Sequence, residues 1–302
     1  MALTHSITVS LADIDSERAG MLKQVLSTLL RSSTVKDVFA QVIDGLPIKT
    51  TYELTITRRF ELLSRMEPSA QSIALSNQFC SSSEMFDNLK LNARTAQLYQ
   101  AAPLYSYCFN MHLLELAAVA VHDMAGNLFA SFHPDGEPRL EQAAGTGFQQ
   151  QGLISLSTMS YIRSDIYPRG VLDVVGYWAE AHIFGGIVVF DRGAEEGARN
   201  CYGAYIHPPY PADLFQLSDS QIAQFSLQAK QQKNDNLNLP LLCRPDARKL
   251  NPNHAFLKLN IYRDRYEREV SPIIRGRSCV VRLENDPDLK EFIYKANEMF
   301  HS

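Results

Sequence analysis

The sequence has little of what marks a secreted, zinc-binding or membrane-spanning protein. Its five cysteines are odd in number and widely spaced, and no Cys-x-x-Cys pair occurs, so neither a disulfide framework nor a zinc knuckle is predicted. The first residues lack the basic and apolar regions of a signal peptide. No run approaches the roughly 18 apolar residues that a spanning helix needs. We therefore expect a reduced, cytoplasmic protein with no membrane partner.

Nucleotide-binding and metal-binding motifs are also missing from the sequence. There is no Walker A sequence, no Gly-x-Gly-x-x-Gly and no kinase motif. There is no His-Glu-x-x-His or other metal-ligand spacing, so we predict no cofactor and no metal. The net charge of −4 gives no overall attraction to nucleic acid. We expect no DNA partner, and an RNA partner would need a local basic patch.

The composition is that of a folded globular protein. Hydrophobic residues make up 45% and charged residues 21% of the 302-residue chain. A chain of this length buries a large core as one domain or as two closely packed halves. Helical patterns alternate with short apolar strand patterns, which favours an α/β or α+β fold. We take residues 1–302 as a single domain.

Hydrophobic periodicity locates the predicted elements. Helical spacing is found in segments 16–30, 35–42, 84–100, 113–132, 169–181, 219–227 and 287–300. Strand patterns are found in segments 6–11, 50–57, 72–80, 187–190, 201–206, 256–262 and 278–283. Thr34 is the predicted N-cap of the second helix and Gly45 its C-terminal cap. Segment 137–152 is a candidate mobile loop, and segment 228–238 a polar linker.

The stretch 173–192 is the densest in core residues and ionisable groups. On a helix, Tyr177 and Glu180 share one face, and His182 follows closely. A buried glutamate beside a phenol keeps a raised pKa and suits acid–base catalysis on an amine nucleophile. The alternative is that Glu180 forms a structural ion pair with Arg192 or Arg169, while Tyr177 is part of the core.

Asp191 and Arg192 end the predicted buried strand 187–190. They are candidate substrate-binding residues, because a carboxylate grips a cation and a guanidinium grips a phosphate. Charged residues in a solvated turn are an equally good interpretation. Ser76 follows an apolar run and is a candidate nucleophile, but no Gly-x-Ser-x-Gly elbow surrounds it, so a turn serine is favoured.

Glu115 and His122 lie seven residues apart on the predicted apolar helix 113–132 and therefore share a face. They are placed to meet each other or a ligand. A histidine on an apolar helix is more often a satisfied core residue, so we predict no metal site here.

Segment 244–282 is locally basic, with ten Lys and Arg against four acidic residues. Interleaved Phe and Tyr make it a candidate RNA or phosphate surface. The alternative is a solvated face with Arg–Glu pairs four residues apart. The candidate RNA-binding residues are Arg263, Arg265, Arg268, Arg275 and Arg277.

The block Gly-Tyr-Trp-Ala-Glu-Ala-His-Ile-Phe-Gly-Gly-Ile-Val-Val-Phe-Asp-Arg-Gly at 176–193 resembles the fungal arginine-containing cyclodipeptide synthases. These enzymes make diketopiperazines from aminoacyl-tRNAs. The resemblance implies a Rossmann-like domain related to class I aminoacyl-tRNA synthetases. It implies aminoacyl transfer from one charged tRNA, attack by a second aminoacyl amine and ring closure. Arginyl-tRNA and a second aminoacyl-tRNA are the expected partners, and no ATP is needed.

The resemblance also implies roles for individual residues. Glu180 would transfer protons, Tyr177 would position the amine, and Asp191 or Asp173 would hold the arginine guanidinium. Ser76 is a loose substitute for the serine nucleophile of bacterial cyclodipeptide synthases, and the basic segment 244–282 would hold tRNA phosphates. Two other hypotheses stay open: an isomerase or cyclase of secondary metabolism that uses Glu180 and His182 as acid and base, and a non-catalytic binding protein.

Overall fold

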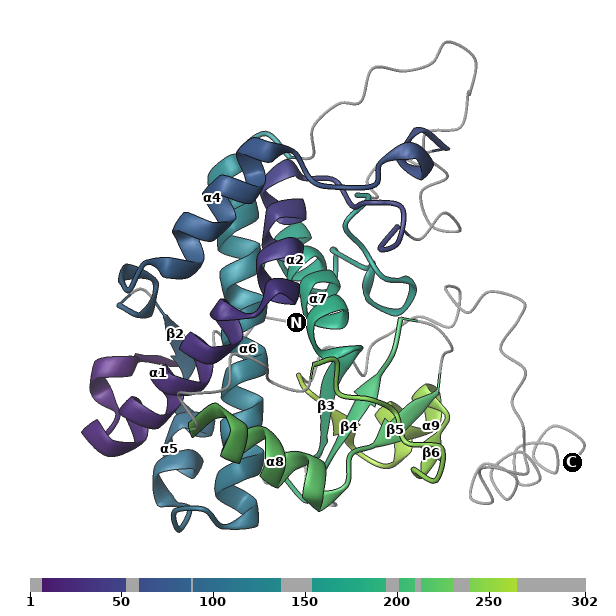
Figure 1. Cartoon of the computed structure of the whole chain (residues 1–302). Coiled ribbons are helices and arrows are strands. Elements are labelled where there is room, and N and C mark those ends of the chain that lie inside the picture. Colours follow the sequence, from purple (N-terminus) through teal and green to yellow (C-terminus); the bar gives the residue numbers. More distant parts are fainter. Residues whose placement is uncertain are drawn as a thin grey trace, which may run out of the picture.

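The computed structural model describes residues 7–52, 60–87, 89–136, 154–193, 201–209, 213–230 and 239–264. A group of packed helices forms one part of the molecule, and a five-stranded sheet lies beside it (Figure 1). Helix α7 (Val171–Phe184) runs directly into strand β3 (Ile187–Asp191) and so joins the two parts. Its last turn is closed by Gly185, whose φ of 85° is the left-handed conformation that glycine adopts readily.

Helix α6 (Tyr107–Phe132) is the centre of the helical part. It is buried on nearly every face, as expected for a helix that is apolar all round. Length and composition alone would let α6 span a membrane, but 78% of its most apolar window is buried inside the fold. The predicted helix 113–132 is confirmed as a core helix. The helices that pack on it are α1 (Ser16–Arg31), α2 (Ser33–Asp44), α5 (Ala93–Ala101), α7 and α8 (Asp219–Lys230).

The first two predicted helices are confirmed, with a small change at one cap. The side chain of Ser32 accepts the Val35 N–H, so Ser32 rather than Thr34 caps α2. Gly45 ends the same helix with a φ of 70°, as its position in the sequence predicts.

Three predicted elements are wrong. The segment 72–80 forms helix α4 (Ala70–Ser81), which begins at the Ser69 N-cap, instead of a strand. The predicted helix 84–100 is divided into η3 (Glu84–Phe86), strand β2 (Lys90–Asn92) and α5, because Asn92 starts a new helix by capping it. Most of the predicted strand 256–262 is helix α9 (Pro252–Lys258) and only its end is strand β7 (Ile261–Tyr262).

The remaining short elements are β1 (Thr8–Ser10), which pairs with β2, η1 (Leu11–Asp13), η2 (Phe60–Ser64) and η4 (Met159–Tyr161).

The five-stranded sheet has the order β6-β5-β4-β3-β7, with β4 at Gly203–His207, β5 at Leu214–Gln216 and β6 at Lys249–Leu250. The mixed helix-and-strand class is confirmed, as are strands 187–190 and 201–206. Every pairing in this sheet is antiparallel. A Rossmann-like sheet is parallel, so the described strands have the α+β arrangement instead.

Several predictions lie outside the described residues. These are most of the strand 50–57, the loop 137–152, the linker beyond Lys230, and the strand and helix at 278–283 and 287–300.

Candidate functional site

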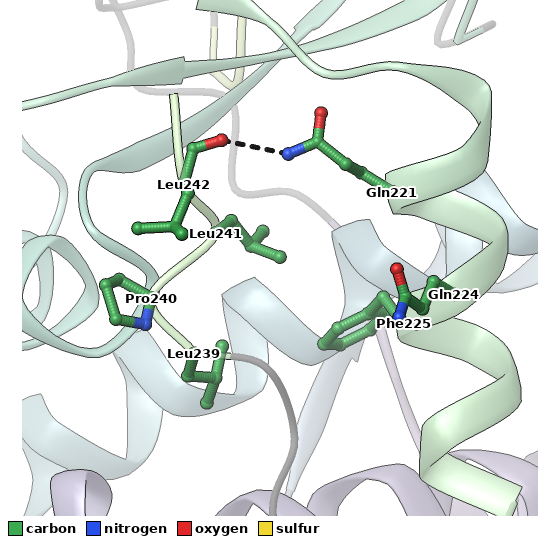
Figure 2. A pocket seen from close by; sticks show the side chains of 7 residues that line it. All are labelled: Gln221, Gln224, Phe225, Leu239, Pro240, Leu241 and Leu242. Atoms are coloured by element: carbon green, nitrogen blue, oxygen red, sulfur yellow. Dashed lines mark hydrogen bonds between the residues drawn. The ribbon is translucent and has the colours of Figure 1, made fainter. Parts of the chain in front are cut away.

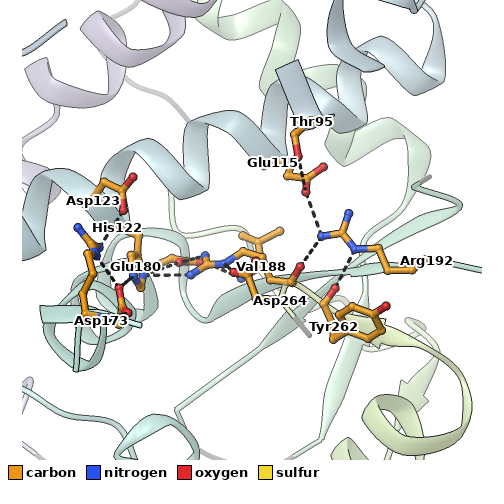
Figure 3. A network of polar contacts seen from close by, with 12 residues as sticks. Thr95, Glu115, His122, Asp123, Asp173, Glu180, Val188, Arg192, Tyr262 and Asp264 are labelled. Carbon is orange, nitrogen blue, oxygen red and sulfur yellow. Dashed lines mark hydrogen bonds and ion pairs between the residues drawn. The ribbon is translucent and has the colours of Figure 1, made fainter. Parts of the chain in front are cut away.

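A network of buried charged side chains lies where α6, α7, β3 and the chain after β7 meet (Figure 3). It consists of two groups joined through one arginine. The Glu180 cluster comprises Glu180, Arg263, His122, Asp173 and Arg169. The Glu115 cluster comprises Glu115, Arg192, His112 and Cys201.

Glu180 has no exposed surface and both of its carboxylate oxygens are bonded. Oε1 accepts the backbone N–H of Val188 at 2.8 Å, and Oε2 forms an ion pair with Arg263. Strand β7 pairs only with Phe190 and Asp191, so the Val188 amide lies beyond the end of that strand. A buried amide needs an acceptor, and Glu180 provides it. The glutamate thus ties α7 to the sheet that follows it.

His122 connects Arg263 to Asp173. Its Nδ1 lies 3.0 Å from Arg263 Nη2, and its Nε2 lies 3.1 Å from Asp173 Oδ1. Arginine only donates, so in the neutral ring Nδ1 accepts and Nε2–H donates to Asp173. Burial lowers the pKa of His122, but the neighbouring carboxylates of Asp173 and Glu180 outweigh burial, so the net shift raises the pKa. Glu180 Oε2 lies 3.8 Å from Nδ1, so the ring and the carboxylate are neighbours without a direct hydrogen bond.

Asp173 stays ionised in this cluster. Its Oδ1 accepts from Arg169 Nε at 2.8 Å and its Oδ2 from the Arg169 backbone N–H at 2.9 Å. Burial raises the pKa of Asp173. The hydrogen bond and charge of His122, together with Arg169, lower the pKa by more, so the net shift is downward.

Aromatic rings enclose the His122 side of the cluster. The Tyr177 ring lies 4.5 Å from that of His122 and 4.6 Å from that of Tyr161, and the Arg263 guanidinium stands over it at 4.7 Å. His122 comes this close to α7 because residue 176 is glycine. A Cβ there would lie 2.7 Å from three atoms of the ring.

In the Glu115 cluster, Arg192 is 1% exposed and surrounded by acceptors. Its Nη2 donates to Glu115 Oε1 at 2.9 Å and to the carbonyl of Arg263 at 2.7 Å, and its Nε donates to the carbonyl of Tyr262 at 3.1 Å. The bond to the Arg263 backbone joins the two clusters. Burial raises the pKa of Glu115, but Arg192 and His112 lower it to about 2, so Glu115 is ionised.

The structure brings Tyr177 and Glu180 together and leaves His182 apart. Tyr177 and Glu180 share a face of α7, as the spacing predicts, and both contact Arg263. The ion-pair partner predicted for Glu180, Arg192 or Arg169, is wrong, because Arg263 takes that place. His182 packs against Trp178 at 4.8 Å, and its buried Nε2 has no hydrogen-bond partner among the described residues. Burial lowers its pKa to about 4.

The other predicted binding residues separate from one another. Asp191 and Arg192 diverge: Asp191 is half-buried and accepts the Gly193 N–H at 2.9 Å, whereas Arg192 points inward. Ser76 lies inside α4, is 1% exposed, and donates to the Lys36 carbonyl at 2.7 Å. The turn position favoured for this serine is therefore wrong, because Ser76 lies within a helix.

The predicted RNA-binding arginines are mostly outside the described residues. Arg265, Arg268, Arg275 and Arg277 belong to that part of the chain. Arg263 is described and is 4% exposed, so the structure places it in the core instead of on a surface.

Sequence reasoning missed His112 and Cys201, and it found no partners for Glu115, His122 and Arg263 in these clusters. Helical spacing put Glu115 and His122 on one face, but nothing in the sequence linked either to a distant arginine. His112 is three residues before Glu115, a spacing that could have been used. Cys201 and Arg263 carry no local signal, because only the fold brings them to the helices.

A cavity of about 440 Å³ lies between α8 and segment 239–242, away from both clusters (Figure 2). Gln221 Nε2 donates to the Leu242 carbonyl at 2.9 Å at one side of it. Its lining includes no residue of either cluster; the lining residues are Gln221, Gln224, Phe225, Leu239, Pro240, Leu241 and Leu242.

Comparison of the chain with protein-family models, with curated proteins and with solved structures gives no match. The candidate function therefore depends on the residues of the site.

Proposed function

We propose that the protein is a cytoplasmic, tRNA-dependent aminoacyltransferase that forms an arginine-containing cyclic dipeptide from arginyl-tRNA and a second aminoacyl-tRNA. One observation carries the proposal. The block 176–193, which resembles the arginine-containing cyclodipeptide synthases, places Glu180 and Arg192 in one buried ionic network. Buried ion pairs contribute little net stability, whereas buried, coupled ionisable groups are typical of functional sites.

Glu180 and His122 form the proton-transfer pair of this proposal. A cyclodipeptide synthesis needs a proton removed from an attacking amine and a proton returned to the leaving hydroxyl of the tRNA. Glu180 Oε2 and His122 Nδ1 are 3.8 Å apart, and Asp173 fixes the ring from its other nitrogen. Tyr177 packs edge-on against the same ring, on the side of the pair that faces α7.

Asp191 is the better candidate for the arginine side chain of the substrate. Asp173 already accepts from Arg169 and His122, so its oxygens are occupied. Asp191 lies at the end of β3 and is half-buried, and none of the ion pairs among the described residues includes it. A carboxylate in that setting binds a guanidinium through two parallel hydrogen bonds.

Exposed basic residues near the sheet are candidates for the tRNA backbone. Within the described part of segment 244–282, Arg248 and Lys258 are exposed, and Lys249 lies over the Phe215 ring at 5.4 Å. Lys and Arg beside aromatic side chains are the chemistry of an RNA surface.

The test is expression of the chain in a heterologous host, followed by mass spectrometry of extracts. We expect an arginine-containing diketopiperazine with the wild type and none with Glu180→Gln. Asp44→Asn is the matched control, because Asp44 is another carboxylate in an ion pair, with Arg65, but belongs to neither cluster. It should lose stability and keep the product.

Purified protein then separates this proposal from the acid–base alternative. The contact of His122 with both Asp173 and Glu180 also suits an isomerase or cyclase that acts on a free small molecule. With labelled arginyl-tRNA, we expect label in the product and its loss after ribonuclease treatment. A product formed from free substrates without tRNA would favour the alternative. Absence of any product from soluble wild-type protein would favour a binding protein.

A further inference from the structure

The Glu115 cluster contains three metal-ligating atoms that converge on one point. Glu115 Oε2, His112 Nδ1 and Cys201 Sγ are buried and lie within 4.8 Å of one another. The three distances are 3.4 Å from His112 to Glu115, 3.3 Å from Cys201 to Glu115 and 3.7 Å from Cys201 to His112. We propose that His112, Glu115 and Cys201 bind a zinc ion. This site is independent of the aminoacyltransferase proposal.

The three distances fit ligand-to-ligand edges around zinc, and the one from His112 to Glu115 is longer than a charge-assisted hydrogen bond. Zinc lies about 2.0 Å from N and O ligands and about 2.3 Å from sulfur, so tetrahedral angles give edges of about 3.3 Å for N–O and about 3.5 Å for both O–S and N–S. The observed values of 3.4, 3.3 and 3.7 Å are close to these. A charge-assisted hydrogen bond to a carboxylate is shorter, at about 2.7–2.9 Å.

The orientation of the ring distinguishes a metal site from a nucleophilic triad. In a Cys-His-acid triad, the thiol and the acid bind opposite nitrogens of the imidazole, which relays between them. Here Cys201 and Glu115 both face Nδ1 of His112. One nitrogen cannot take a proton from the thiol while it donates a proton to the carboxylate, so the three groups do not form a relay. A single ion between the three atoms is bound by all of them.

Arg192 and Thr95 hold Glu115 in the required position. Glu115 Oε1 accepts from Arg192 Nη2 at 2.9 Å and from Thr95 Oγ1 at 3.5 Å, which leaves Oε2 for the metal. Arg192 Nη1 lies 3.4 Å from Cys201 Sγ and would donate to the bound thiolate. Such outer partners orient the ligands of metal sites and tune their affinity.

The donor set selects zinc among the common divalent ions. Imidazole and thiolate exclude Mg²⁺ and Ca²⁺, which prefer oxygen ligands, and one carboxylate with one thiolate balances the two charges of the ion. On binding, the ion replaces the thiol proton of Cys201, which leaves to solvent, and the lone pair of His112 Nδ1 coordinates while Nε2 keeps its proton. Three protein ligands are typical of catalytic zinc sites, in which water or substrate takes the fourth position.

The test is zinc binding by the full chain after chelator treatment and dialysis against ZnCl₂. We expect about one zinc per chain by elemental mass spectrometry, and an affinity at least tenfold lower, measured with a competing chromophoric chelator, in Cys201→Ser and in His112→Gln. Cys80→Ser is the matched control, because Cys80 is another buried free thiol, located in α4. It should bind like the wild type.

Two outcomes would overturn the site: wild-type protein that binds no zinc, or Cys201→Ser that binds as well as Cys80→Ser. Cobalt substitution of the wild type provides a test that needs no variant. A thiolate-to-cobalt charge-transfer band with strong tetrahedral d–d absorption supports the ligand set. Weak octahedral absorption without that band contradicts it. Because both readouts report on the ion alone, they stay informative whether or not a cyclic dipeptide is made.

Discussion

The Glu180 cluster and the Glu115 cluster contain the same kinds of side chain at different spacings. In the first, each oxygen of Glu180 and Asp173 meets a donor at hydrogen-bond distance. In the second, Oε1 of Glu115 is bonded to Arg192, but its Oε2 meets His112 and Cys201 only at 3.4 and 3.3 Å. The wider spacing around Oε2 matches the ligand-to-ligand edges of the proposed zinc site.

The comparison separates two uses of buried charge. Short, complete hydrogen bonding fixes α7 against β3 and keeps Glu180 and His122 in one arrangement. The wider spacing around Glu115 leaves its Oε2 able to coordinate the proposed zinc ion, beside the same α6 helix. The two clusters meet at Arg263, whose side chain binds Glu180 and whose carbonyl binds Arg192. Arg263 is therefore the residue that the two clusters share.

The largest effect should come from removing the side chain that completes the Glu180 cluster. Arg263→Met leaves Glu180 charged and unpaired in a fully buried position. We expect a loss of about 3–5 kcal/mol in the free energy of unfolding, measured by urea denaturation. The double variant Glu180→Gln/Arg263→Met should regain part of it, since the unpaired charge is gone. Equal stability of Arg263→Met and wild type would show that this ion pair is absent in solution.

The two histidines of this region should respond to pH in opposite ways. His122 has carboxylate neighbours, which raise its pKa, whereas burial lowers the pKa of His182 to about 4. The unfolded-state pKa is about 6.5. A lowered pKa means that the unfolded state binds the proton first, so the His182 contribution is fully present above about pH 6.5 and is lost as pH falls toward 4.

The difference between the unfolded and folded pKa of His182 corresponds to a loss of roughly 3 kcal/mol in the free energy of unfolding between pH 7 and pH 4. We therefore expect the free energy of unfolding of wild type to fall more over this range than that of His182→Phe, by up to this amount. The raised pKa of His122 has the opposite sign, because its contribution is present at low pH and is lost as pH rises through the folded pKa. Parallel pH profiles for wild type and His182→Phe would contradict the buried, unpaired state of His182.

The sequence predicted elements better than it predicted partners. Spacing located α1, α6, α7 and β3, because each has a long apolar pattern and a clear start or stop. It failed for α4, whose strand-like run begins after the Ser69 cap, and for the antiparallel pairing of β3 with β4, since neighbouring strands are chosen by the whole sheet. It also placed Tyr177 and Glu180 on one face. It gave no means of finding Arg263 or Cys201, which lie 83 and 86 residues from the glutamates that they contact.

The smallest effect on stability should come from adding a methyl group where α6 and α7 pack closely. Gly176→Ala puts a Cβ at 2.7 Å from the His122 ring, so the ring or the helix must shift. We expect a loss of about 1–3 kcal/mol by urea denaturation, as for other overpacked sites. Gly20→Ala in α1 is the matched control, because nothing lies within 4 Å of its added Cβ, and it should gain about 0.5–1 kcal/mol from helix propensity. The zinc affinity of Gly176→Ala should stay unchanged, because the glycine touches His122 and none of the three proposed ligands. A change in zinc affinity would mean instead that the clusters are coupled beyond Arg263.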